Sequence, residues 1–291
     1  MADAFETIRH HFFLNGRSLQ ECYEIAFPRF ARRWEWMDPP EREYKDFINC
    51  WAAVEAYFNE YPPATDYFQP YIKDDGSPAV EFKVAIPMGV MHPDTGDPIL
   101  YSGRVDFLAQ NEPNSCYVVD EKTTKAMGPS WPYQWDMRGQ FYGYVYAMRH
   151  LGFPCAGALV RGIAIQQTQF KFAEKPIFYR DDQLELWWRE ANKKAARAVE
   201  MYERAKEWED FDDEDSRKAM HYQFDKSFGD ACSSYGGCQF TDLCLHPDPF
   251  QIYGGWEERV WDPLAQDPTS KSENRLKDIE TQTLEELMAG M

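Results

Sequence analysis

Three segments decide the fold expected of this chain: Gly103-Arg104-Val105-Asp106, Val118-Val119-Asp120-Glu121-Lys122-Thr123 and Gln140-Phe141-Tyr142-Gly143-Tyr144. In the first two, apolar residues lead into an aspartate, which predicts neighbouring strands that each carry a carboxylate. In the third, Gln140 and Tyr144 stand one turn apart and share a face of a predicted helix at 135–151. The pattern predicts two acids, a lysine and a Gln/Tyr pair held on adjacent elements.

Periodicity outside these segments predicts a mixed sheet flanked by helices. Further helices are expected at 47–58 and 183–208, the second capped by Asp181 or Asp182. Apolar alternation and short apolar runs predict strands, at 79–87, 100–109, 116–120, 157–165 and 169–172. We therefore expect an α/β (α+β) protein with one main domain. Its parts are a helical N-terminal region at 1–78, a core with a cysteine-rich end at 79–250, and a polar tail at 251–291.

Composition limits the classes of function. The chain has 291 residues, 44% of them hydrophobic, and a net charge of −18, which lowers the expectation of tight, nonspecific duplex binding. Much of the acid lies at 207–215 and after Trp261, and such clusters are usually solvated. No apolar run is long enough for a membrane helix, and the first residues lack a secretion signal. We expect a soluble, cytoplasmic protein, in the host cytoplasm if it is encoded by a phage.

Asp106 and Asp120 are the strongest candidates for a metal site. Two carboxylates brought together repel each other unless a cation lies between them, and oxygen ligands of this kind suit Mg²⁺ or Mn²⁺. Lys122 shares a strand face with Asp120, so its ammonium can orient a water molecule or neutralise charge in a transition state. Glu81, on the preceding strand, is a further acidic candidate.

These residues resemble the RecB-like branch of the PD-(D/E)XK nuclease superfamily, including phage exonucleases, over roughly residues 79–148. The resemblance implies a restriction-endonuclease-like fold, with Asp106 and Asp120 as ligands of the catalytic metal and the Glu121 carbonyl as a third. It implies that Lys122 is the catalytic lysine. Gln140 and Tyr144 would contact the substrate strand or brace the site, and we group Arg104 with them as a nucleic-acid contact.

One departure from the family concerns the metal ligands. RecB-like nucleases often carry a histidine on an upstream helix, and 41–60 contains none. Glu55 is the nearest acidic substitute.

The seven cysteines are distributed unevenly, because Cys232, Cys238 and Cys244 follow one another at intervals of six. Three thiolates hold zinc or an iron–sulfur cluster only with a fourth ligand. The resemblance extends to iron–sulfur nucleases of the AddB and CRISPR-adaptation types, which implies a [4Fe–4S] cluster with Cys22 as the early ligand and Cys50 as its competitor. The alternatives are Zn²⁺ with His246, or three ordinary buried cysteines.

We therefore expect a metal-dependent DNA nuclease. Family analogy predicts an exonuclease that acts on single strands or on duplex ends. It acts alone or as a subunit recruited by a helicase or recombination partner. One rival is a nucleic-acid-binding or assembly protein that keeps the fold and cleaves nothing. The other is a zinc-stabilised adaptor.

Overall fold

The computed structural model describes residues 1–37, 44–112, 115–208, 213–226 and 240–245, together with Cys232 and Cys238. The chain divides into two compact units, Met1–Glu258 and Arg259–Met291. The first unit contains both the predicted helical region and the predicted core. The predicted tail at 251–291 and His246 lie outside the described residues.

Three helices form the N-terminal layer: α1 (Ala2–Phe13), α2 (Leu19–Met37) and α3 (Phe47–Glu60). Two of them have clear start signals. Ser18 and Glu21 form a reciprocal capping box before α2, and the Asp46 side chain accepts the Asn49 N–H at the start of α3. Their apolar faces pack together and against Ile163 of the sheet.

The sheet contains six described strands: β1 (Gln69–Pro70), β2 (Val80–Met91), β3 (Pro98–Glu112), β4 (Ser115–Thr124), β5 (Cys155–Ile165) and β6 (Phe170–Phe178). Their order is β1-β3-β4-β5-β6, and β2 also pairs with β3. All pairs are antiparallel except β4 with β5. The sheet is therefore mixed, as predicted.

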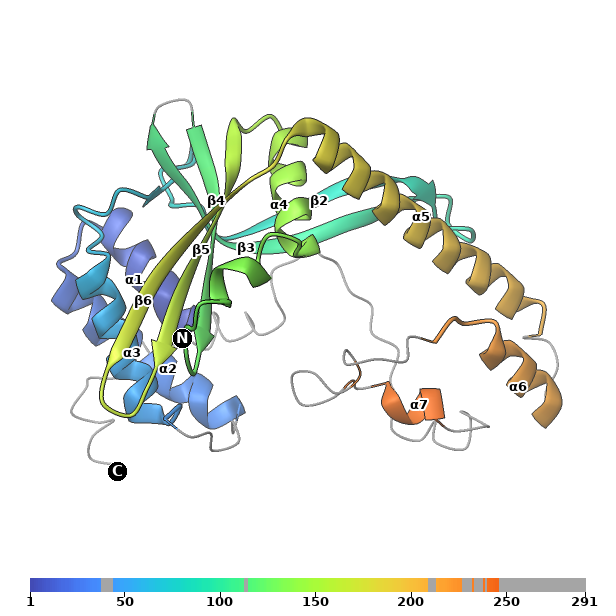
Figure 1. The fold of residues 1–291 in the computed structure, drawn as a ribbon, viewed down its shortest axis with the longest axis horizontal. Coiled ribbons are helices and arrows are strands. Elements are labelled where there is room, and N and C mark those ends of the chain that lie inside the picture. The colour runs from blue at the N-terminus through green and yellow to red at the C-terminus, as the bar shows by residue number, and fades with distance from the viewer. Residues whose placement is uncertain are drawn as a thin grey trace. The chain divides into compact units, whose positions relative to one another are not determined.

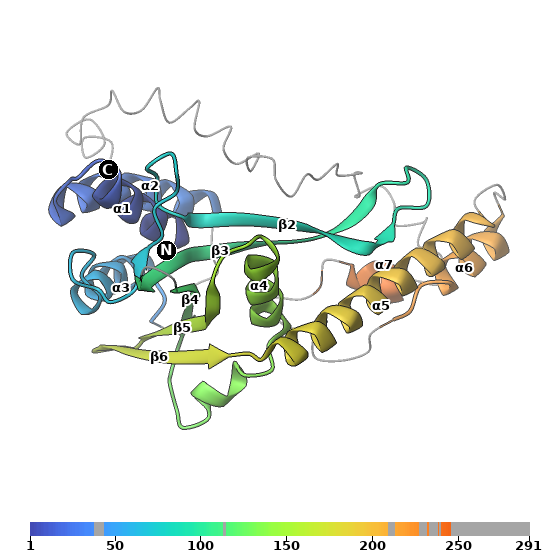
Figure 2. The ribbon, with the colours of Figure 1, turned by 90° about the horizontal axis from the view of Figure 1, so that it is seen from above.

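The sheet forks within β3 and β4. These strands pair from Phe107–Val119 to Glu112–Ser115. On the other side of Phe107, β3 pairs with β2 alone, and beyond Val119, β4 pairs with β5 alone. Figures 1 and 2 show the β2–β3 ribbon leaving the remaining strands at this point. Asp106 and Asp120 are the first residues of the two diverging branches.

The remaining elements are η1 (Trp131–Gln134), α4 (Gly139–His150), α5 (Asp181–Lys206), α6 (Glu214–Tyr222) and α7 (Thr241–Leu245). Parallel strands need a crossover connection, and η1 and α4 supply it between β4 and β5. Side chains alternate along β5, so Ala158 and Val160 pack with α4 while Ile163 and Ile165 pack with the N-terminal layer. The two helical groups cover opposite faces of the sheet.

The long helix α5 supports the β2–β3 ribbon. Asn192 Oδ1 accepts the Gly89 N–H at 2.7 Å. Near the other end of the helix, Tyr202 and Lys206 both bond the Asp94 carboxylate, each at 2.5 Å. These contacts explain why β2 and β3 extend beyond the predicted 79–87 and 100–109.

The predicted cap of the long helix is wrong. The N-cap is Arg180, whose backbone N–H is accepted by the Gln183 side chain. Asp181 is inside the helix and bonds Arg149, while Asp182 pairs with the Arg180 guanidinium. The helix predicted at 135–151 also begins later, at Gly139, because 135–138 form a bend and a turn between η1 and α4. Among the described residues, no helix is long and apolar enough to cross a membrane.

The α4 helix approaches β3 closely because Gly103 has no side chain. A Cβ on Gly103 would overlap the ring of Tyr144, which is itself buried. The Gly103 and Tyr144 of the sequence pattern are therefore direct packing partners. The close approach brings the Gln140–Tyr144 face of α4 over the fork.

We expect Gly103→Ala to lower the free energy of unfolding by about 1–3 kcal/mol, the usual cost of overpacking a tight contact. Chemical denaturation followed by circular dichroism measures this. Gly128→Ala is the matched control, since a Cβ there meets nothing within 4 Å. Equal stability of the two variants would show that Tyr144 moves aside without cost.

Candidate active site

Asp106 and Asp120 face each other at the fork. The last β3–β4 pair is Phe107–Val119, so the next residue on each strand is one of these acids. Asp120 is only 1% exposed. The Glu121 N–H donates to Asp106 Oδ2 at 2.7 Å, and this side-chain bond continues the connection where the backbone ladder has ended. Two carboxylates are thus fixed side by side on separate branches of the sheet.

Lys122, Gln140 and Tyr144 complete a connected set around Asp120. Lys122 Nζ lies 2.5 Å from Asp120 Oδ2. Gln140 Nε2 donates to Asp120 Oδ1 at 2.9 Å and approaches the Tyr144 hydroxyl at 3.4 Å. The Tyr144 hydroxyl donates to the Arg104 carbonyl at 2.7 Å. The structure therefore joins four of the residues singled out by the sequence pattern through direct contacts, and Asp106 joins them through the Glu121 backbone.

The two aspartates differ from ordinary surface acids in their ionisation. Burial, then the Asp120 charge, raises the pKa of Asp106 well above its usual value of 3.8. Burial also raises the pKa of Asp120, although Lys122 opposes the rise. Both shifts have the same physical meaning: negative charge in this low-dielectric fork needs a cation nearby.

An oxygen-rich site with excess negative charge fits Mg²⁺ or Mn²⁺. Asp106 and Asp120 are the side chains that would hold such an ion, and Lys122 compensates part of their charge. Within the described part of the chain, no three His, Cys, Asp or Glu side chains are grouped as a complete metal site. The two aspartates alone supply the side-chain ligands that this geometry supports.

Glu81 lies beside the fork in an unusual conformation. Its neighbours pair as Val80–Phe107 and Phe82–Val105, which places it across from Asp106, but its φ is 47°. Left-handed backbone at a residue other than glycine stores strain, and such strain gathers at functional sites. Glu81 Oε2 binds Arg104 Nε at 2.7 Å. Arg104, the predicted nucleic-acid contact, thus neutralises the negative charge of Glu81 at the edge of the site.

A cavity of about 310 Å³ adjoins Asp106 on the side of the N-terminal layer. Its lining includes Glu81, Glu121 and two residues of α1, Glu6 and Arg9. Desolvation of its carboxyl group, then the charge of Glu81, raises the pKa of Glu6 to about 7, although the residue as a whole is exposed. The sequence analysis missed both α1 residues. Nothing in their local pattern separates them from an ordinary amphipathic helix.

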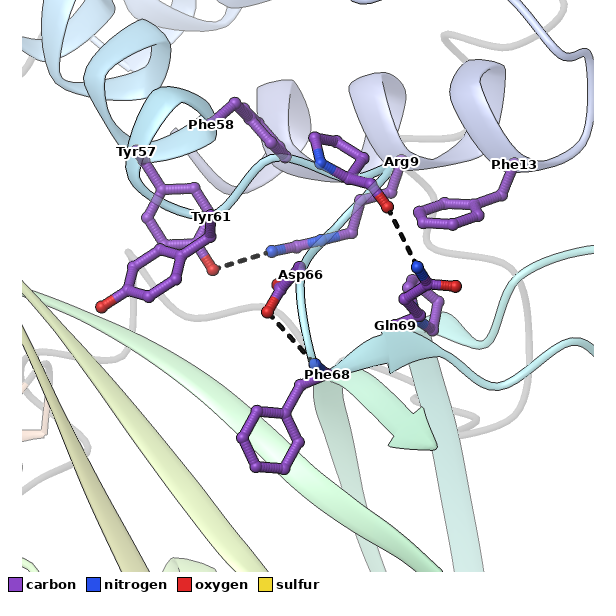
Figure 3. Close-up of a pocket in the computed structure, with 10 residues that line it drawn as sticks. Arg9, Phe13, Tyr57, Phe58, Tyr61, Asp66, Phe68 and Gln69 are labelled. Atoms are coloured by element: carbon purple, nitrogen blue, oxygen red, sulfur yellow. Dashed lines mark hydrogen bonds between the residues drawn. The ribbon is translucent and has the colours of Figure 1, made fainter. Parts of the chain in front are cut away.

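Two buried arginines also escaped the sequence analysis. Arg9 pairs with both carboxylate oxygens of Glu121, and Arg161 pairs with both of Asp66. Each also donates to the Tyr57 hydroxyl, at 3.1 Å and 3.2 Å. Figure 3 shows Arg9 reaching from α1 to Tyr57 of α3. These bonds tie the N-terminal layer to the sheet beneath the fork.

Glu55 is not brought to the fork. Its Oε1 accepts the Trp51 indole N–H at 2.8 Å within α3, and it is absent from the lining of the acidic cavity. The substitute ligand proposed for the missing histidine is therefore occupied elsewhere.

The cysteines predicted to hold a cluster lie in different surroundings. Cys22 is fully buried in the N-terminal layer, and burial raises the pKa of its thiol to about 11. Its competitor Cys50 is buried in the same layer. Cys232 and Cys244 are exposed, and the Cys238 N–H donates to the Cys232 carbonyl at 2.8 Å. Cys22 is thus packed among apolar side chains of the N-terminal layer, whereas Cys232 and Cys244 face solvent.

No protein-family model matches the chain, and searches of curated proteins and of solved structures found no match. The functional argument therefore depends on the geometry of the fork.

We expect Asp106→Asn to stabilise the metal-free protein at pH 8, because the folded wild type must there ionise a carboxyl group whose pKa is raised by burial. The folded protein keeps the Asp106 proton to higher pH than the unfolded chain does, so the wild type loses stability as pH rises from 3.8 through the raised pKa. Denaturation in EDTA from pH 4 to pH 8 measures the difference, which should vanish at the acid end.

Asp75→Asn is the control of opposite sign. A hydrogen bond from Ser77 lowers the pKa of Asp75, so this variant should be less stable than the wild type at neutral pH and equal to it in acid. A parallel response of both variants would contradict the account of Asp106.

Proposed function

We propose that this chain is a divalent-metal-dependent nuclease of the RecB-like PD-(D/E)XK type that hydrolyses DNA phosphodiester bonds. The observation that supports it is the fork: Asp120, Lys122, Gln140 and Tyr144 form one contacting set, and Asp106 is bonded to the backbone N–H of Glu121, between Asp120 and Lys122. If the Asp-x-Lys triplet had arisen by chance, there would be no reason to expect the other residues of the pattern to lie next to it in the structure.

Each residue of the set has a role that follows from its contacts. Asp106 and Asp120 hold the cation. Lys122, whose side chain is one-third exposed, reaches solvent from beside Asp120 and can orient a water molecule or stabilise charge on a phosphate. Gln140 fixes the orientation of Asp120. Tyr144, through the Arg104 carbonyl, fixes the distance between α4 and β3.

The cation supplies Lewis-acid stabilisation of the phosphate and a lowered pKa for a bound water molecule. The protein contributes a cradle that is charged, partly desolvated and positioned before substrate arrives. Arg104 and Gln140, which are exposed beside the acids, are the side chains best placed to meet the DNA backbone.

Action on DNA ends, rather than within a strand, is proposed from the resemblance alone. The direction of digestion along a DNA strand does not follow from the geometry of the fork. A helicase or recombination partner would deliver single strands or ends to the site, and this also follows from the family analogy.

A second candidate function is supported by the net charge of −18. A net negative charge disfavours tight contact with a DNA backbone, and this suits a role in assembly, or in nucleic-acid association through a limited surface, without cleavage. In that case the acids at the fork would serve folding or partner binding, and metal-dependent cleavage would be absent.

We expect Lys122→Ala to reduce Mn²⁺-dependent digestion of end-labelled DNA by about 100- to 10,000-fold, the range for loss of a group that acts in the transition state. The assay compares single-stranded, linear duplex and circular DNA with Mg²⁺ or Mn²⁺. Lys171→Ala, at an exposed position on β6, is the matched control and should retain full activity.

Circular dichroism establishes that both variants are folded. A wild-type protein that loads Mn²⁺ but cleaves none of these substrates, nor RNA, would overturn the nuclease proposal in favour of the binding protein.

A [4Fe–4S] cluster on Cys22, Cys232, Cys238 and Cys244 is a separate proposal, and it requires the buried Cys22 to become accessible to the cluster. Anaerobically purified protein should then contain iron and acid-labile sulfide in equal amounts. Cys238→Ala should lose both, and Cys116→Ala, a buried strand cysteine, should keep them. Zinc without sulfide would favour the zinc alternative, and no metal would indicate ordinary cysteines.

A further inference from the structure

Arg9 contacts the residue that follows each aspartate. Its guanidinium pairs with the Glu121 carboxylate, next to Asp120, and its Cζ lies 4.0 Å from the ring centroid of Phe107, next to Asp106. It is 4% exposed. The buried Arg9 guanidinium of α1 therefore contacts both β3 and β4, on the face of the sheet covered by the N-terminal layer.

Strand alternation places Glu121 on the opposite face from Asp120 and Lys122. Asp120 and Lys122 face α4, where Gln140 meets them, while Glu121 faces α1 and lines the acidic cavity with Asp106 and Glu81. The Glu121 side chain is 5% exposed, and its charge contributes to the raised pKa of Asp106 and of Glu81. An unpaired Glu121 would be a strong additional ligand for any cation at the fork.

We infer that Arg9 is a positioning residue that pairs with the Glu121 side chain, keeps it out of the metal's coordination shell, and thereby limits the site to Asp106 and Asp120. The inference builds on the proposed metal-dependent function and assigns a role that the sequence pattern did not reveal. It also explains the placement of the Glu121 N–H on Asp106, because a side chain anchored at Arg9 fixes the backbone that donates this bond.

Arg161 provides a matched control for stability. It is also buried, at 1% exposure, and also donates to Tyr57, but its carboxylate partners are Asp66 and Glu174. Removing Arg9 leaves the buried Glu121 carboxylate without its partner, and removing Arg161 leaves the half-buried Asp66 carboxylate without its own. Both changes are destabilising. Only Arg9 bonds a residue of the fork.

The experiment measures Mn²⁺ affinity by electron paramagnetic resonance at pH 7.5 without nucleic acid. Arg9→Met should bind Mn²⁺ about tenfold more tightly than the wild type, because a positive charge is removed and Glu121 becomes available. Arg9→Met/Glu121→Gln should return toward wild-type affinity. Arg161→Met should leave the affinity unchanged. On DNA, Arg9→Met should lower kcat with little change in KM, since the Glu121 N–H no longer fixes Asp106.

A purely structural role for Arg9 predicts the reverse: weaker Mn²⁺ binding in proportion to lost stability, equal for Arg9→Met and Arg161→Met. That result, or an unchanged affinity in Arg9→Met, would overturn the inference while leaving the nuclease proposal intact. If the wild type binds no Mn²⁺, both fail. Should Arg9→Met not fold, Arg9→Gln removes the charge and the two-bond pairing with Glu121, and it should change the Mn²⁺ affinity in the same direction by a smaller factor.

Discussion

The separation of β3 from β4 is the constraint on which the rest of the structure depends. A continuous ladder would pair the backbone of both strands and leave their side chains to the two faces. Because the ladder stops at Phe107–Val119, Asp106 can accept the Glu121 N–H, and Asp120 can bond Gln140 and Lys122. The β2–β3 ribbon then needs support of its own, which α5 supplies through Gly89 and Asp94.

The fork also determines how the layers share the site. Strand β4 directs Asp120 and Lys122 to one face and Glu121 to the other. The first face meets an amide from α4, and the second meets a guanidinium from α1. Neither helix alone surrounds the acids, so the electrostatic character of the fork depends on correct docking of both. Buried charge is tolerated at Asp120 and Glu121 because each has a partner from a different layer, Gln140 of α4 and Arg9 of α1.

The sequence predicts the features that depend on residues close to one another along the chain. The mixed sheet, the carboxylate strands and the Gln140/Tyr144 face all follow from periods of two and of 3.6 residues. The cap of α5 failed because Arg149, distant in sequence, bonds Asp181. The Glu55 carboxylate accepts the Trp51 indole N–H within α3, and its role as a metal ligand stays a prediction. Arg9 meets Glu121 across 112 positions, and no local pattern records such a pairing. Predictions held where neighbours in sequence decide the outcome and failed where tertiary partners do.

The contact between Gly103 and Tyr144 has a consequence for how this sequence can change over time. The smallest side chain on β3 and a large ring on α4 fill one space, so neither position can vary independently. A larger residue at 103 is compatible only with a smaller one at 144, and that exchange would also remove the hydroxyl that binds the Arg104 carbonyl. Amino-acid substitutions at positions 103 and 144 are therefore expected to be coupled. Homologous chains that lose the glycine should have lost the tyrosine as well.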